Sequence, residues 1–60
     1  MKPPLTIERL DANGNLHIVE VTVSLPAAQR AFNEAVAKNT GEVVRVVDAT
    51  GALLFSFGPD

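Results

Sequence analysis

The chain has 60 residues, contains no cysteine and carries a formal net charge of -2. A chain this short forms one domain at most and buries only about 60% of the surface that it exposes when unfolded. Without cysteine, neither a disulfide nor a thiolate metal site adds to so small a core. We therefore expect residues 1–60 to form a single domain that depends on packing and gains stability from association.

The composition also excludes several functional classes. The segment MKPPLTIE lacks the apolar stretch of a signal peptide, and no segment approaches the roughly 18 consecutive apolar residues of a membrane span. The five basic residues are scattered singly along an acidic chain, which argues against nucleic-acid binding. We expect a soluble cytoplasmic protein that contacts no membrane.

Two strands are predicted in the first third of the chain. LTIERL and NLHIVEVTV alternate apolar and polar residues with the period of two that suits a sheet with one face on a core. The DANG segment between them predicts a hairpin turn, because Gly14 accepts a positive φ at little cost and Asp11 can bond the turn backbone. A regular hairpin places these residues on its core face: Leu5, Ile7, Val19, Val21 and Val23.

The period then changes to that of a helix. Apolar residues in SLPAAQRAFNEAVAKNTG fall on one helical stripe, made of Leu25, Ala28, Phe32, Ala35 and Val36. Ser24 is placed to cap the first turn, where Pro26 is also tolerated, and Gly41 suits the C-terminal cap. The pattern predicts a helix over roughly residues 25–39.

EVVRVVD and ALLFSF predict a second hairpin around the segment DATG. The element order is then ββαββ, which predicts an α+β fold with a four-stranded, mainly antiparallel sheet and one helix packed on one face. Strand orders 2-1-3-4 and 1-2-4-3 both avoid parallel neighbours, and the sequence leaves both open.

The segments AVAKNTGEVVRVVDATG and FGPD resemble parts of small bacterial ββαββ domains of unknown function. In those domains an Ala-rich helix ends at a glycine, and the last strand ends with an aromatic residue followed by Gly-x-Asp. The likeness covers about the last 35 residues, and Phe57 stands where a tyrosine is expected. The resemblance implies the fold and no activity.

The two D-A-x-G segments lie thirty-seven residues apart and invite a functional interpretation. Asp11, Asn13 and Asn15 have the D-x-N-x-N spacing that opens a calcium-binding EF-hand loop. An EF-hand also needs Gly at loop position 6 and Glu at position 12, whereas this loop has Gly14 at position 4 and Thr22 at position 12. Turn chemistry explains both segments better than a metal site does.

An internal repeat is the other interpretation, and it conflicts with the best core. A shift of thirty-seven residues matches Ile7 to Val44, which in a regular second hairpin lies on the opposite face from Phe55 and Phe57. Burying a phenylalanine gains roughly 1.5 to 3 kcal/mol. We therefore favour the register that buries Phe55 and Phe57 and interpret the similar turns as convergent.

Since one helix covers one face of the sheet, the other face should be polar, yet it is apolar in either register. The favoured register exposes Leu10, Leu16, Ile18, Val44, Val46 and Leu54, which we take as the candidate partner-binding residues. The alternative register exposes the first three together with Val43, Val47, Leu53, Phe55 and Phe57.

Groups for catalysis are scarce. His17 is the single histidine, Glu8 and Glu20 are better explained as residues of a solvated sheet face, and no glycine-rich phosphate loop is present. We expect no enzymatic activity, no metal, no cofactor and no small-molecule substrate.

The sequence thus favours a small protein-interaction module that binds through the uncovered sheet face. The partner is a second copy or a larger protein, and a small inhibitor of phage or plasmid type falls within this class. A nucleic-acid-binding module is the alternative, because open sheets can present side chains to single strands.

Overall fold

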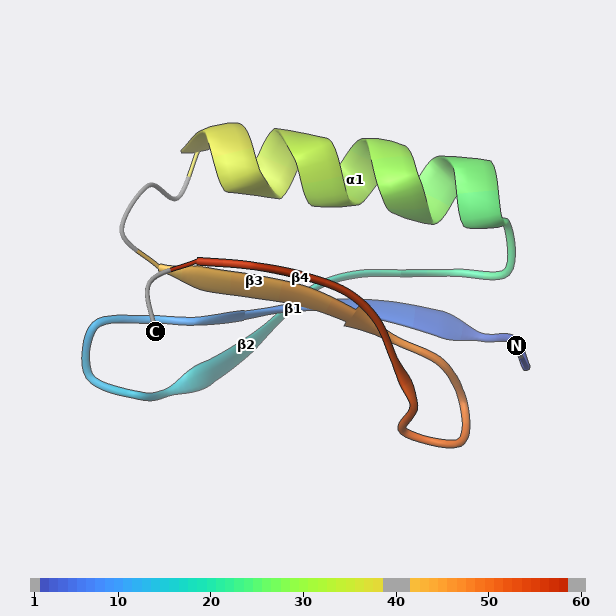
Figure 1. Cartoon of the computed structure of the whole chain (residues 1–60), viewed down its shortest axis with the longest axis horizontal. Coiled ribbons are helices and arrows are strands. Elements are labelled where there is room, and N and C mark those ends of the chain that lie inside the picture. Colours follow the sequence, from blue (N-terminus) through green and yellow to red (C-terminus); the bar gives the residue numbers. More distant parts are fainter. Residues whose placement is uncertain (1, 39–41, 59–60) are drawn as a thin grey trace.

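The computed structural model describes residues 2–38 and 42–58. The elements are β1 (Leu5–Leu10), β2 (Leu16–Thr22), α1 (Leu25–Lys38), β3 (Val43–Val47) and β4 (Leu53–Phe57) (Figure 1). The four strands form one antiparallel sheet in the order β2-β1-β3-β4, and α1 lies along one face of it. The predicted ββαββ fold is confirmed, and strand order 2-1-3-4 is the one adopted.

The two D-A-x-G turns have the same geometry. In each, the aspartate and the residue four positions later are joined by a backbone hydrogen bond of 3.0 Å. Gly14 and Gly51 have φ values of 82° and 85°, which confirms the predicted left-handed conformation. One Oδ1 atom organises each turn: Asp11 accepts from the amides of Asn13 and Asn15, and Asp48 accepts from those of Thr50 and Ala52.

Helix α1 begins as its sequence predicts. The Ser24 side chain accepts a hydrogen bond from the Ala27 amide, and the Ser24 carbonyl accepts one from Ala28. The predicted cap at Gly41 lies outside the described residues. Within residues 2–38 and 42–58, no helix is both long enough and apolar enough to cross a membrane.

The core lies between α1 and the two central strands. Leu5 and Ile7 of β1 and Val44 and Val46 of β3 are fully buried beneath a helix surface made of Ala28, Ala31 and Ala35. Methyl side chains on the helix let its backbone approach the sheet closely, so the larger aliphatic side chains of the strands fill the space. Ala31 belongs to this contact although it lay outside the predicted stripe.

A β-bulge in the second hairpin corrects the predicted register. Val47 pairs with Leu53, but Val46 then pairs with Phe55 rather than Leu54. The extra residue, Leu54, packs against the core together with Phe55. The bulge therefore places Phe55 on the same face as Val44 and Val46, and the conflict between the repeat and the phenylalanines disappears.

The candidate residues of the second hairpin were thus placed wrongly by sequence. Val44 and Val46 are fully buried under the helix, and Leu54 packs against the same core. Their prediction as exposed residues assumed a hairpin without a bulge, in which every side chain of β4 alternates strictly from the turn.

A second bulge corrects the first hairpin. Ile7 pairs with Glu20 and Glu8 with Ile18, so Val19 is the extra residue of β2. The predicted core valines of this strand are consequently exposed, Val23 most of all. Glu20 takes the place on the helix side of the sheet that regular pairing assigned to Val19.

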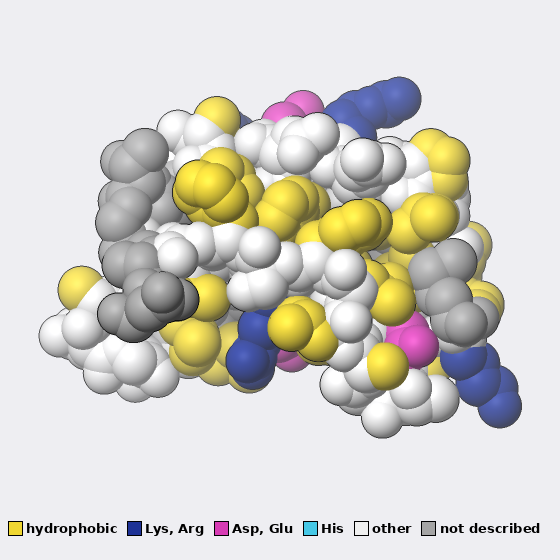
Figure 2. Space-filling view, viewed as in Figure 1, with side chains coloured by type: hydrophobic (Ala, Val, Ile, Leu, Met, Phe, Trp, Pro, Cys, Tyr) yellow, Lys and Arg dark blue, Asp and Glu magenta, His cyan; other side chains and the backbone are white. Residues whose placement is uncertain are grey.

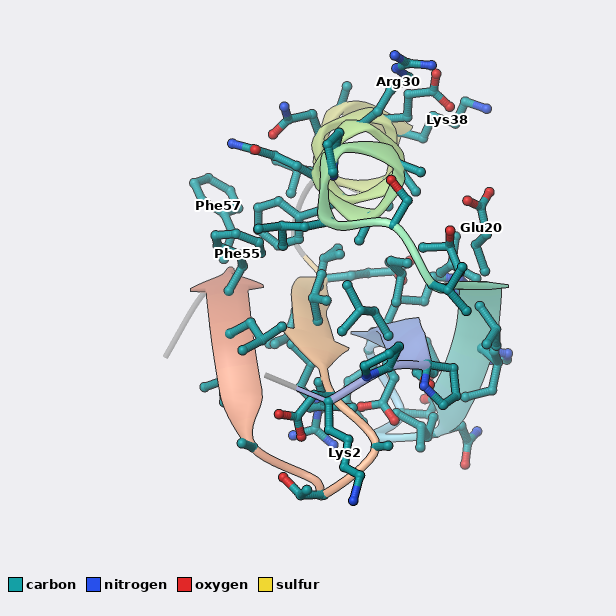
Figure 3. The ribbon with its side chains drawn as sticks, turned by 90° about the vertical axis from the view of Figure 1, so that its right-hand side faces the viewer. Lys2, Glu20, Arg30, Lys38, Phe55 and Phe57 are labelled. Carbon is teal, nitrogen blue, oxygen red and sulfur yellow. The ribbon has the colours of Figure 1, made fainter. Side chains whose placement is uncertain are left out.

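The three phenylalanines lie on one side of the molecule, between α1 and the edge strand β4. Figure 2 shows hydrophobic side chains in this region, and Figure 3 shows Phe55 and Phe57 on the helix side of β4. The rings of Phe32 and Phe55 have centroids 5.8 Å apart and pack against the core. Phe57 is 59% exposed, so its predicted burial was wrong.

The bulge in the second hairpin makes a direct prediction for two neighbouring valines. Val46→Ala should lower the free energy of unfolding by about 2 kcal/mol because it leaves a cavity in the core, whereas Val47→Ala should cost less than about 1 kcal/mol. Urea denaturation at low micromolar protein, where association contributes little, measures both. A larger loss in Val47→Ala would mean that the hairpin has the regular register.

Candidate interaction surface

One face of the sheet points away from α1, and we call it the open face. Its side chains form three rows that run across the strands. Side chains alternate along each strand, so the residues before and after a buried residue in the sequence point to the open face. Paired residues share a face, which gives the rows Leu16-Leu10-Val43, Ile18-Glu8-Arg45-Ser56 and Val21-Thr6-Val47-Leu53. No element of the described chain covers this face (Figure 1).

The open face is unusually apolar for an uncovered surface. Its two outer rows are aliphatic except for Thr6. Leu16 is 48% exposed, and Ile18, Val21 and Leu53 are 57%, 56% and 59% exposed. Single exposed aliphatic residues are common, but a contiguous group of them is typical of interaction surfaces.

An ion pair lies at the centre of the open face. The Nε atom of Arg45 donates to Oε1 of Glu8 over 2.8 Å, and the two residues pair directly across β1 and β3. The Glu8 side chain is 13% exposed and the Arg45 side chain 39% exposed. The two terminal amino groups of Arg45 and the second carboxylate oxygen of Glu8 have no partner among the described residues, so the pair retains unused hydrogen-bonding capacity.

The pairing of β1 with β3 is symmetric about this ion pair. Glu8 and Arg45 are 37 residues apart, and the ladder runs from Thr6 opposite Val47 to Leu10 opposite Val43. An antiparallel ladder has a local twofold axis between two directly paired residues. A shift of 37 residues thus carries each β1 residue of the open face onto one of β3.

The structure brings together only half of the predicted partner-binding residues. Leu10, Leu16 and Ile18 lie on the open face. The same face carries three residues that the alternative register predicted to be exposed, Val43, Val47 and Leu53. Val21 was missed. The thirty-seven-residue spacing was the available signal, because it relates Leu10 to Val47 and Leu16 to Leu53.

The carboxylates of the turns are occupied by contacts within the turns and with neighbouring segments; Oδ2 of Asp48, for example, accepts from the Lys2 amide over 3.5 Å. Oδ2 of Asp11 lies 2.9 Å from Nε2 of His17, while its other oxygen accepts two backbone amides. Asp48 accepts a 2.6 Å hydrogen bond from the Thr50 hydroxyl. Among the described residues, no three His, Cys, Asp or Glu side chains form a group that could hold a metal ion.

A shallow groove lies on the other side of the sheet, between α1 and β2. Its volume is about 240 Å³, and it is lined by Glu20, Ala27, Arg30, Ala31 and Glu34. Figure 3 shows Glu20 on the helix side of β2. The groove is smaller than the roughly 300 to 1,000 Å³ of typical ligand pockets.

Comparison with known proteins adds no functional information: no family model, no curated protein and no solved structure matches this chain. The function must therefore be inferred from the chemistry of the molecule's own surfaces. The packing of α1 explains why one face of the sheet is apolar, whereas it does not explain the apolar side chains of the open face.

The turn aspartates predict acid sensitivity. The hydrogen bond from His17 lowers the pKa of Asp11 from 3.8 to about 2, and the hydrogen bond from Thr50 lowers that of Asp48 from 3.8 to about 2. At pH values between the lowered and the ordinary pKa, both carboxylates are ionised in the folded state, whereas the same two carboxylates bind protons in the unfolded chain. Their stabilising effect is therefore complete above about pH 4 and is lost as pH falls towards 2.

Urea denaturation between pH 5 and pH 2 measures this dependence. The double variant Asp11→Asn, Asp48→Asn keeps an oxygen acceptor in each turn but cannot titrate, so its stability should fall less steeply with acid than that of the parent protein. Equal slopes for the two proteins would show that other carboxylates cause the acid dependence.

Proposed function

We propose that this protein is a non-enzymatic protein-interaction module that binds its partner through the open face. The observation that supports this most strongly is the row pattern of that face, with aliphatic side chains in both outer rows and a salt bridge in the middle. Burying such a surface removes apolar area from water at a gain of about 25 cal/mol per Å². A protein surface of matching shape is the partner that realises this gain.

The alternative, a nucleic-acid-binding module, has less support. Proteins that bind single strands on a sheet stack bases on exposed aromatic side chains and contact phosphates with free basic groups. The three phenylalanines lie towards α1 or are placed on the helix side of β4 (Figure 3). Arg45, the basic residue among the described residues of the open face, is paired with Glu8.

An enzymatic function has less support for a different reason. Catalysis needs a nucleophile, acid or base held beside a pocket that excludes water. The groove beside α1 is shallow and open, and its charged residues, Glu20, Arg30 and Glu34, are all exposed. On the open face, one oxygen of the Glu8 carboxylate accepts a hydrogen bond from Arg45, and no pocket adjoins it among those found in the described residues.

Site-specific photo-crosslinking in the cell of origin tests the proposed function without assuming a partner. A photoreactive phenylalanine analogue at Ile18, in the middle row of the open face, should yield a crosslinked protein adduct. The same analogue at Gln29, an exposed residue of α1, is the matched control and should yield little or none. Both positions are exposed, so neither replacement should disturb the core.

The mass of the adduct identifies the kind of partner. An adduct of twice the chain's 6.4 kDa indicates a second copy, and any other mass indicates a different protein. Failure of Ile18 to crosslink, or crosslinking from Gln29 in its place, would contradict the proposed interaction surface.

A further inference from the structure

We infer that the occupant of the open face is a second copy of this chain, packed sheet against sheet with its strands aligned. This inference rests on the proposed function, because it specifies the partner of the same surface. The twofold axis of this dimer runs parallel to the strands and passes between β1 and β3. In this arrangement β1 of one copy lies over β3 of the other.

The row pattern of the open face matches itself in this arrangement. Rotation about an axis parallel to the strands keeps each row level and reverses the order of strands within it. Leu10 then lies over the partner copy's Val43, Val21 over its Leu53, and Ile18 over its Ser56, as follows from the strand pairing. At each of these three positions an apolar side chain faces an apolar or small one. Aligned packing of this kind is one of the two common ways in which sheets stack.

The central ion pair selects this partner. Each Glu8 would lie over Arg45 of the other copy, so that four charges of alternating sign meet at the centre. The unused amino groups of Arg45 and the second oxygen of Glu8 would then find partners across the interface. A purely apolar partner would instead bury an ion pair without completing its hydrogen bonds, which is unfavourable.

Rotation about the perpendicular in-plane axis gives a different result. It would place Glu8 over Glu8 and Arg45 over Arg45, and like charges at an interface oppose binding. The ion pair thus specifies both the partner and its orientation.

The size of the face sets the expected strength. Four strands about 4.8 Å apart and three rows about 6.8 Å apart give roughly 400 Å² for each copy. A standard interface buries about 800 Å² for each partner. We therefore expect a dimer that is populated at high micromolar to millimolar concentration and dissociates on dilution.

Exchanging the two charges tests this inference in a folded protein. The double variant Glu8→Arg, Arg45→Glu keeps the ion pair within each chain and should fold and dimerise as the parent does. Mixed dimers of parent and variant, however, bring Glu8 over the new glutamate and Arg45 over the new arginine. With random mixing, heterodimers would make up half of all dimers. We expect their share to be lower than this by about tenfold or more.

Native mass spectrometry of an isotope-labelled parent mixed with the unlabelled variant counts the three dimers directly. Labelled and unlabelled parent form the control and should mix at random in a 1:2:1 ratio. Ile18→Glu, which puts a charge in the middle row beside Glu8 on the edge strand β2, should give a folded monomer.

Three results would overturn the inference. Random mixing of parent and variant would show that Glu8 of one copy does not face Arg45 of the other. If Ile18→Glu nevertheless abolished the dimer, binding through the open face would still be supported. A dimer that survives Ile18→Glu would indicate pairing through a sheet edge. A parent protein that is monomeric at millimolar concentration would exclude a second copy, and crosslinking from Ile18 to a different protein would then preserve the proposed function alone.

Discussion

One constraint governs this molecule: a single helix has to cover a four-stranded sheet whose two faces are both apolar. α1 covers β1 and β3 with a surface of alanines, and the four large aliphatic residues beneath it are fully buried. Within residues 2–38 and 42–58 no second helix covers the other face, and a 60-residue fold has little core to spare. The open face is therefore a consequence of the fold, and its composition is the basis of the proposed function.

The two β-bulges decide which apolar residues go to which face. In β4 the extra residue brings Phe55 over to the helix side while Val47 and Leu53 remain on the open face. In β2 the extra residue has the opposite effect, because it brings Glu20 to the helix side and leaves Val21 on the open face. The helix side of the sheet is thus richest in apolar side chains over β1, β3 and β4, and the open face extends across all four strands.

Sequence alone predicted the features that depend on local chemistry. The glycines with positive φ, the aspartates that organise the turns and the Ser24 cap each follow from the conformational preference of one residue. Bulges do not follow from the preference of a single residue. Whether a strand contains an extra residue depends on how its side chains pack against the rest of the fold. For this reason Val44 and Val46 were placed on the wrong face, while Leu10, Leu16 and Ile18, which precede the bulge of β2, were placed correctly.

The ion pair between Glu8 and Arg45 has a different role from the aliphatic rows around it. The Arg45 side chain of this pair is 39% exposed, and a salt bridge with such solvent access adds little stability, typically about 0 to 1 kcal/mol. Charges at the centre of an interface instead determine which surface can approach and in which orientation. We propose that the aliphatic rows supply the affinity of the open face and that the ion pair supplies its specificity.

The open face should be covered when the protein associates. Methyl NMR with a soluble paramagnetic agent tests it most directly, because line broadening reports the solvent access of each methyl group. On dilution from millimolar to low micromolar protein, broadening should increase at Leu10, Ile18 and Val47, and stay constant at Ala37, an exposed residue of α1. Unchanged broadening on the open face, or protection confined to β4, would contradict association through the open face.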